Sequence, residues 1–430
     1  MVVDKDMHKD NFIFKNKELY CEGVRVADIA KEVGTPFYLY SYKALVDRFN
    51  EIKSAFKEVY PVICFSMKSN NNIAVLKALV DKGAGLDIVS GGELKKALMA
   101  ECPAERIVFA SVGKTSDEII SAIKAGILFF NVESIAELEE INILAERLGK
   151  KVQVVLRINP DVEAATHDAI KTGTLEKKFG IDLMNAYKIF MSKDTYPSLK
   201  LSGIHIHIGS QITSIRPFVS AIKKTVAFID RLKKDGICLE YFDIGGGFGI
   251  RYKDEKLQPV SKFAAAIIPY LKKAGLKIVI EPGRFIAGNA GIFVTSVLYF
   301  KDNGVKKFFI VDGSMSELIR PSLYSAYHKI IPVKETTVKK IKVDVVGPVC
   351  ESGDFLGKDR LLPELDKGQL LAVMSAGAYG YVMASNYNMR PRPAEVMVKG
   401  NRFDIVRRRE SFKDLIKTEK IPEFLKDENS

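Results

Sequence analysis

Residues 60–90 read YPVICFSMKSNNNIAVLKALVDKGAGLDIVS, and this stretch decides the fold. Its apolar runs at 60–67 and 85–90 predict two buried strands, and the segment between them has the periodicity of a helix. Neither run alternates with polar residues, which is typical of parallel strands that are covered on both faces. The stretch therefore predicts a strand, a helix and a second strand parallel to the first.

This unit recurs along the chain until about residue 283. Helical segments such as SIAELEEINILAERLGK, residues 134–150, separate further apolar and β-branched runs. We predict strands at residues 60–67, 85–90, 106–111, 126–131, 152–159, 201–209, 239–246 and 276–282. Eight strand–helix units in succession are typical of a (β/α)8 barrel, the TIM barrel. The sequence thus predicts an α/β domain of this type over residues 36–283.

The pattern changes after Gly283. Closely spaced strands follow, in a predicted hairpin at 291–313 that turns at Asp302–Gly304 and in runs at 338–350, 368–377 and 394–406. Such spacing predicts an antiparallel β-domain, a barrel or a sandwich, over residues 284–430. The N-terminal segment 1–35, which contains ELYCEGVRV, is expected to add a strand to this domain.

Composition limits the class of protein. With 430 residues, 47% of them apolar and 27% charged, the chain is long enough for more than one ordered domain. It contains no apolar run of 18 residues, which argues against a membrane-spanning helix. The first residues lack the apolar core of a secretory signal. Five dispersed cysteines without a CxxC pair favour reduced thiols in the cytoplasm over disulfides or a zinc ribbon.

The net charge of +12 raises the question of nucleic-acid binding. The basic residues are spread along the chain, however, and their densest cluster is only Arg407–Arg409. No motif of a nucleic-acid-binding fold accompanies them. We therefore expect a solvated basic surface, suited to anionic small molecules, and neither nucleic acid nor membrane as a partner.

Polar and glycine-rich residues follow four of the predicted barrel strands. Lys68 ends the first strand, and the others end in HIHIGSQ (205–211), DIGGG (243–247) and EPGR (281–284). The carboxyl ends of the strands carry the chemistry in barrels of this type. Since all four sets belong to the same rim, the sequence predicts the functional site there.

Each of these residues has more than one use. Lys68, held among apolar residues, is expected to have a lowered pKa and to form a Schiff base, although an isolated lysine more often extends to solvent. The backbone of Gly245–Gly247 can approach an anion, or can simply form a tight turn. His205 and His207 face the same side of a strand. They suit a metal ion, a ring stacked on an aromatic cofactor, or a hydrogen-bonded core.

The remaining candidates are acids, an arginine and a thiol. Glu281 beside a pyridine nitrogen would favour the protonated ring that an electron sink needs. A structural ion pair between Glu281 and Arg284 is the alternative. Cys350 lies among small residues next to Glu351, so it is either a buried apolar side chain or an exposed, reactive thiol.

Taken together, these motifs resemble the pyridoxal-phosphate decarboxylases of the alanine-racemase fold type, the family of class 2 ornithine, lysine and arginine decarboxylases. Within it, the resemblance is to the branch that acts on diaminopimelate. It covers essentially the whole chain. Its most specific pieces are HIHIGSQ, DIGGGFG, EPGR, RPSLY (320–324) and GPVCESGD (347–354).

The resemblance implies a role for each candidate residue. Lys68 would hold pyridoxal 5'-phosphate covalently, His207 would stack on its ring, and Glu281 would pair with the ring nitrogen. Cys350 would enter the site from the partner subunit of a homodimer and act as a catalytic proton donor. The other residues implied to surround the cofactor are Ser210, Gly245, Gly246, Gly247, Pro282, Gly283, Arg284 and Tyr379.

The resemblance also bears on the substrate. Arginine suits a bidentate grip on a carboxylate, and Arg320 lies with Tyr324 near Glu351, which can take an ammonium group. Meso-diaminopimelate has an amino-acid group at its far end, whereas ornithine, lysine and arginine do not. The expected products are therefore L-lysine and carbon dioxide. Arg284 and Tyr379 are also expected to contact the substrate, and no metal is expected.

Four other functions compete with this one. A sibling decarboxylase for ornithine, arginine or carboxynorspermidine would share the cofactor, and Arg320 with Glu351 argue against it. A racemase would carry arginine in place of Glu281. A non-catalytic regulatory homologue would be expected to lose Lys68, Glu281 or Cys350. A metal-dependent barrel hydrolase would use the histidine pair.

Overall fold

The computed structural model describes residues 12–160, 162 and 179–425. These residues form two compact units. The first comprises Ser41–Gly291 and Gly377–Val382, and the second comprises Phe12–Tyr40, Ile292–Ala376 and the chain from Met383. Residues 36–40 were predicted to belong to the barrel, whereas in the structure they belong to the second unit. The reason is that Phe37–Ser41 forms a strand, β4, of that unit's sheet.

The first unit contains a closed barrel of eight parallel strands, as the sequence predicted. The strands follow one another around it in the order β10-β11-β12-β5-β6-β7-β8-β9, so chain order and spatial order agree. They are β5 (Val62–Ser66), β6 (Gly85–Ile88), β7 (Ile107–Phe109), β8 (Phe129–Val132), β9 (Val152–Arg157), β10 (Leu199–His205), β11 (Tyr241–Asp243) and β12 (Lys277–Ile280).

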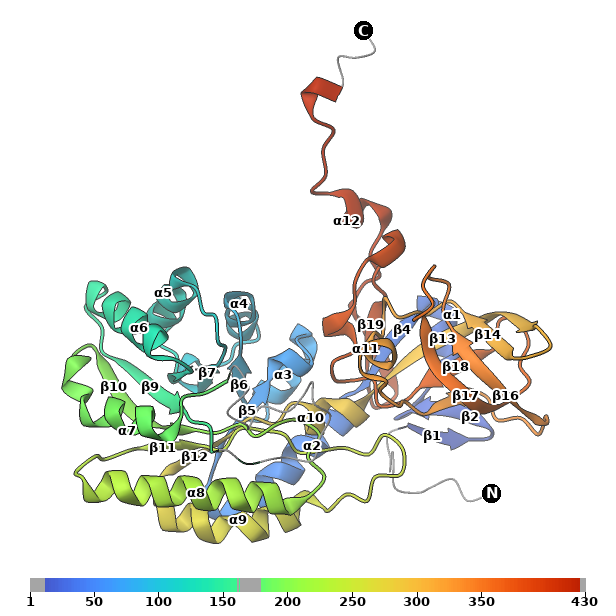
Figure 1. Cartoon of the computed structure of the whole chain (residues 1–430). Helices are drawn as coiled ribbons and strands as arrows, with labels where there is room; N and C mark the ends of the chain where they lie inside the picture. Colours follow the sequence, from blue (N-terminus) through green and yellow to red (C-terminus); the bar gives the residue numbers. More distant parts are fainter. Residues whose placement is uncertain (1–11, 161, 163–178, 426–430) are drawn as a thin grey trace. The chain divides into compact units, whose positions relative to one another are not determined.

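Helices lie around the outside of this barrel (Figure 1). Local signals start and end them. In α5, for example, Thr115 and Glu118 form a capping box and Gly126 ends the helix in the left-handed conformation. The helices are α2 (Tyr42–Ala55), α3 (Ile73–Val80), α4 (Gly91–Met99), α5 (Ser116–Ala125), α6 (Ile135–Arg147), α7 (Leu183–Met191), α8 (Ile215–Lys234), α9 (Val260–Ala274) and α10 (Arg284–Ala287).

Two kinds of side chain fill the barrel. An apolar cluster lies among the strands, made of Cys64, Val108, Phe129, Val155, Tyr241 and Val279. Buried polar residues occur nearer the carboxyl ends, namely Asp87, Asn131, His205, Asp243 and Glu281. Apolar packing therefore supports the barrel, while its carboxyl end carries charged and hydrogen-bonding groups.

The second unit contains a nine-stranded sheet with β17-β16-β14-β13-β4-β19-β20 as its main order. The predicted hairpin is present as β13 and β14. The expectation of a purely antiparallel domain is wrong at one place, because β14 and β16 pair in parallel. The chain between them contains a helix and a strand, α11 and β15, which gives the length that a parallel return requires. The remaining elements are β13 (Gly291–Asp302), β14 (Lys307–Val311), α11 (Arg320–Tyr324), β15 (Ile330–Pro332), β16 (Lys340–Val346), β17 (Phe355–Pro363), β18 (Leu370–Val373), β19 (Ala394–Lys399), β20 (Arg402–Arg407) and α12 (Phe412–Ile416).

The described part of the N-terminal segment belongs to the second unit, but its strands do not extend the nine-stranded sheet. Its strands β1 (Phe12–Lys15), β2 (Glu18–Cys21) and β3 (Val24–Arg25) form a separate three-stranded sheet, followed by α1 (Val26–Val33). Side chains of this segment pack in one apolar cluster with the nine-stranded sheet. Burial of apolar surface attaches the segment together with backbone hydrogen bonds, from Leu19 to Val333 at 2.8 Å and from Glu335 to Lys17 at 2.7 Å.

Two predictions from composition can be compared with the described residues. No described helix combines the length and the apolar character needed to cross a membrane. All five cysteines are free thiols. Cys21, Cys64 and Cys102 are buried, whereas Cys238 and Cys350 are exposed.

Candidate active site

Lys68 follows β5 in a short 3-10 turn, Met67–Ser69, at the carboxyl end of the barrel. Its Nζ atom lies 3.1 Å from the Oδ2 atom of Asp87 on the next strand. Burial alone would lower the pKa of Lys68, but the charges of Asp87 and Glu281 outweigh it and raise that pKa. The expectation of a lowered pKa is therefore wrong. Lys68 is a half-buried ammonium group held by an ion pair.

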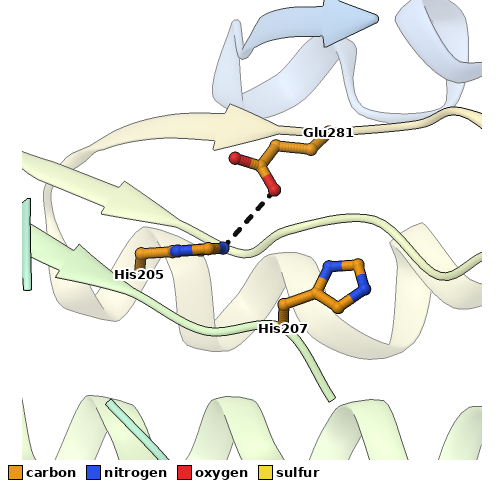
Figure 2. A group of neighbouring side chains, drawn as sticks. All are labelled: His205, His207 and Glu281. Atoms are coloured by element: carbon orange, nitrogen blue, oxygen red, sulfur yellow. Dashed lines mark ion pairs between the residues drawn. The ribbon is translucent and has the colours of Figure 1, made fainter. Parts of the chain in front are cut away.

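Glu281 directly follows β12 and is buried. Its carboxylate accepts a hydrogen bond from Asn131 at 3.0 Å, and the Nε2 atom of His205 lies 3.4 Å from its other oxygen (Figure 2). Burial would raise the pKa of Glu281, but His205 and Lys68 outweigh this effect and lower it. The barrel thus holds a buried anion at the end of β12.

His207 lies just beyond the end of β10 and is half-buried. Its Nδ1 atom accepts a hydrogen bond from the backbone of Gly246 at 3.3 Å. Burial and the nearby Lys68 lower the pKa of His207 well below its usual value, so the ring is neutral. A neutral imidazole can stack on an aromatic ring or bind a metal ion.

The metal alternative has a geometric basis. One ligand atom each from His205, His207 and Glu281 lies within 4.8 Å of the others. Figure 2 shows the two imidazoles on one side of the Glu281 carboxylate. The three groups are therefore compatible with a metal ion or with an aromatic cofactor between His207 and Glu281.

The backbone of the glycine turn Gly245–Gly247 packs directly against the backbone of neighbouring segments, including that of Glu281. A Cβ atom on Gly246 would overlap the carbonyl oxygen of Glu281, and Gly247 has a φ of 98°, in the region that favours glycine. No larger side chain fits at Gly246. The backbone N–H groups of the turn also bind neighbouring side chains, since Gly245 donates to Asp243 and Gly246 to His207.

We expect Gly246→Ala to lower the free energy of unfolding by about 1–3 kcal/mol, because the new methyl group meets backbone atoms. Urea unfolding measures the change. Gly92→Ala is the matched control, since Gly92 is exposed in α4 and a Cβ there makes only ordinary contact. Equal stability of Gly246→Ala and the unmodified chain would contradict this account of the turn.

Arg284 forms a second cationic corner of the site. It is buried at the start of α10 and donates hydrogen bonds to Ser210, at 3.1 and 3.2 Å, and to Tyr252 at 2.6 Å. Its guanidinium also lies 4.7 Å from the centre of the Tyr379 ring. Sequence alone left open an ion pair between Glu281 and Arg284. In the structure Arg284 instead donates to Ser210 and Tyr252, and Glu281 accepts from Asn131. The corner suits an anion.

The neighbouring residues connect this corner to Lys68. The backbone N–H of Tyr379 donates to Ser69 at 2.7 Å, and Tyr379 contributes to the raised pKa of Lys68. Pro282 accepts a backbone hydrogen bond from Ser66. A Cβ atom on Gly283 would lie 2.9 Å from the Cβ atom of Ser66. The predicted residues of the first unit thus lie together around the end of β5.

Three polar residues at this end of the barrel were not predicted from the sequence. Asp87 and Asn131 each lie inside a short apolar strand, where a single polar residue was not recognised as a signal. Tyr252 lies in the chain between β11 and α9. Asp243 was quoted only as part of a motif. The signal that could have revealed Asp87 and Asn131 is a single carboxylate or amide near the carboxyl end of an otherwise apolar strand.

The second unit holds the other predicted residues. Arg320, the first residue of α11, is buried, and its Nη1 atom lies 3.0 Å from Nε2 of His328. Tyr324 ends the same helix and is half-buried. His328 in turn lies 2.9 Å from the backbone oxygen of Met374. These contacts fix the direction of the Arg320 side chain.

Cys350 and Glu351 lie in the loop between β16 and β17, and both are exposed. The backbone N–H of Cys350 donates to the side chain of Asn388 at 3.1 Å. Asp354 accepts hydrogen bonds from the backbone of Val349 and Met315, both at 2.7 Å. Cys350 is therefore an exposed thiol on a hydrogen-bonded loop, which excludes the buried apolar alternative.

Comparison with known proteins decides between the uses of this site. Residues 42–288 match the family model described as pyridoxal-dependent decarboxylase, pyridoxal binding domain. The chain belongs to the pyridoxal-dependent decarboxylase family. The match covers the barrel, including Lys68, His207, Glu281 and Arg284. Membership in this family favours a cofactor over a metal ion between the histidines and Glu281.

Individual members of the family match over almost the whole chain. A diaminopimelate decarboxylase of Aquifex aeolicus is 46% identical over 93% of this chain and 95% of its own length. The solved diaminopimelate decarboxylase of Helicobacter pylori in complex with L-lysine is 40% identical, with a TM-score of 0.88 over 91% of this chain and 98% of that one. The enzyme from M. jannaschii has 36% identity and a TM-score of 0.93 over 97% and 99% of the two chains.

The residues at the barrel's carboxyl end fit a pyridoxal group. Lys68 would supply an amine, Glu281 a buried carboxylate for the ring nitrogen, and Arg284 a cationic donor for a phosphate. Buried oxygens of Asp87 and Asn131 also have no hydrogen-bond partner among the described residues. As a member of this family, the protein uses pyridoxal phosphate.

Proposed function

We propose that this protein removes carbon dioxide from meso-2,6-diaminopimelate and releases L-lysine, the last step of lysine biosynthesis. The observation that carries the proposal is the placement of Lys68 and Glu281 at one end of a barrel in a chain that aligns nearly end to end with diaminopimelate decarboxylases. The enzyme is thus a carboxy-lyase with a pyridoxal cofactor.

Different barrel residues bind different parts of the cofactor in this proposal. Lys68 would be the amine that holds it covalently and that the substrate amine would replace. His207 would stack on the ring and Glu281 would pair with the ring nitrogen. The phosphate would be held by Ser210, Arg284, Tyr379 and the Gly245–Gly247 turn. When bound, the cofactor supplies an electron sink for the electron pair left on Cα as carbon dioxide departs.

Residues of the second unit determine which substrate is bound and donate the proton that replaces the lost carboxylate. Arg320 and Tyr324 bind the distal carboxylate, and Glu351 takes the distal ammonium group. Arg284 and Tyr379 also contact the substrate. The thiol of Cys350 gives a proton to Cα after the bond to the carboxylate breaks. Because Cys350 is exposed on its own chain, we place it in the site of a partner subunit, so that the active form is a homodimer.

The five free thiols support a reducing compartment. We therefore place the enzyme in the cytoplasm.

The decisive experiment measures carbon dioxide release by the purified protein loaded with pyridoxal phosphate. Meso-diaminopimelate, ornithine, lysine and arginine are compared at equal concentration. We expect release from meso-diaminopimelate alone. Release from one of the simple diamino acids would overturn the roles of Arg320 and Glu351. Binding of the cofactor without release from any substrate would favour carboxynorspermidine as the substrate or a regulatory homologue.

A further inference from the structure

A second carboxyl group lies beside Glu281 in the barrel. The side-chain amide of Asn131 donates to Glu281 at 3.0 Å and to Asp243 at 3.2 Å. Asn131 is on β8 and Asp243 is on β11, which are not neighbours, so these hydrogen bonds cross the barrel interior. All three side chains are buried. One buried amide thus joins two buried carboxyl groups.

Two carboxyl groups in one buried site cannot both be ionised without a large electrostatic cost. The surroundings decide which of them carries the charge. His205 and Lys68 lower the pKa of Glu281, whereas burial and the neighbouring Glu281 raise the pKa of Asp243 well above its usual value. The two pKa shifts thus favour Glu281 over Asp243 as the ionised member of the pair.

The other groups that face this pair are consistent with this assignment. Asp243 accepts a hydrogen bond from the backbone of Gly245 at 2.9 Å. The Oδ1 atom of Asn131 has no hydrogen-bond partner among the described residues, so its two N–H groups set the orientation of the amide. The titratable groups around the pair are Lys68, Asp87, His205, His207 and the buried thiol of Cys64.

We propose that Asn131 and Asp243 are positioning residues for Glu281: the Asn131 amide fixes the direction of its carboxylate, and the carboxyl group of Asp243 holds the single proton that the two acids share. The proposal rests on the proposed function, in which Glu281 faces the ring nitrogen of the cofactor. The charge on Glu281 then depends on an amide and an acid drawn from two other strands.

The test replaces Asn131 by the isosteric aspartate. Asn131→Asp converts the bridging donor into a third carboxyl group, which disfavours the charge on Glu281. We expect kcat to fall about 10–100-fold, as for the loss of a hydrogen bond to a charged group, while KM changes little. The acid limb of the pH profile of kcat should move to higher pH, because Glu281 becomes ionised only there.

Two readouts do not depend on turnover. Titration of the cofactor-free protein with pyridoxal phosphate gives the dissociation constant, which we expect to increase for Asn131→Asp. The visible absorbance of the bound cofactor, followed against pH, should shift together with the acid limb of kcat. These measurements keep the proposal testable if the substrate assignment is wrong.

The double variant Asn131→Asp with Asp243→Asn restores one amide and two carboxyl groups. We expect it to recover most of the cofactor affinity and kcat lost by Asn131→Asp alone. Ser202→Ala is the control, because Ser202 is buried on β10 and its hydroxyl bonds to Gln153 and Lys200. It should leave both quantities unchanged.

The outcomes separate the explanations. Unchanged affinity, absorbance and pH profile in Asn131→Asp would overturn the proposal. So would a double variant no better than the single one, since a merely structural loss is not repaired by exchanging the two groups. If every variant binds cofactor as expected but the unmodified protein releases no carbon dioxide from meso-diaminopimelate, the proposed function fails and the positioning roles stand.

Discussion

Lys68→Ala is expected to abolish both the covalent attachment of pyridoxal phosphate and carbon dioxide release. A positioned proton-transfer group is typically worth about 10²–10⁴ in rate. In the proposed function, Lys68 also anchors the cofactor and is the group that the substrate replaces. We therefore expect kcat to fall by more than about 10⁴-fold. The visible absorbance of the protein–cofactor bond and carbon dioxide release from meso-diaminopimelate measure the two losses.

A second variant separates the covalent role of Lys68 from its charge. Lys68→Arg keeps a cation beside Asp87, where the lysine now lies at 3.1 Å, but cannot form a Schiff base. We expect it to bind the cofactor without covalent attachment and to be inactive. Lys82→Ala, at an exposed lysine, is the control and should behave like the unmodified protein. Retained covalent absorbance in Lys68→Ala would show that another lysine is the anchor.

The raised pKa of Lys68 shows where reasoning from the sequence fails. Its apolar strand predicts burial, and burial lowers the pKa of a lysine. The opposing carboxylate, Asp87, is 19 residues away on the next strand, and only the closed barrel brings the two together. The sign of a pKa shift depends on such neighbours, which spacing along the chain does not reveal.

The difference between local sequence signals and contacts made only in the folded chain also explains which strands could be predicted. The eight barrel strands were predictable because each is a local apolar run followed by a helical segment. The strands β4 and β17 were not predicted. β17 has the sequence FLGKDRLLP, in which three consecutive charged residues interrupt the apolar run that would predict a strand. β4 belongs to the second unit although it directly precedes the first helix of the barrel unit, so chain order suggested the wrong partner for it.

Within the site, residues on recognisable motifs were found and isolated ones were not. Glycine turns and histidine pairs are visible in the sequence because their chemistry needs several residues in succession. Asn131 is a single polar residue within the strand FFNV. Its importance arises from hydrogen bonds to Asp243 and Glu281, which are 112 and 150 residues away. A partner so distant in the chain is determined only by the fold.

Arg320→Ala is expected to reduce kcat/KM for meso-diaminopimelate by about 100-fold, the effect of losing a charge-assisted contact with a carboxylate. Cofactor affinity and absorbance should be unchanged, because all the residues proposed to hold the cofactor belong to the first unit. Arg320→Lys should give an intermediate value, since an ammonium group keeps the charge but loses the bidentate geometry. Steady-state kinetics at a fixed cofactor concentration measure kcat/KM for each variant.

Arg320 is buried beside His328, so its removal also tests the stability of the second unit. Thermal unfolding of each variant therefore accompanies the kinetics. Arg402→Ala, at an exposed arginine on β20, is the matched control and should change neither measurement. If Arg320→Ala is folded and its kcat/KM equals that of the unmodified protein, another group binds the distal carboxylate. A folded variant that has lost activity on meso-diaminopimelate while keeping the cofactor spectrum would identify Arg320 as the residue that selects this substrate.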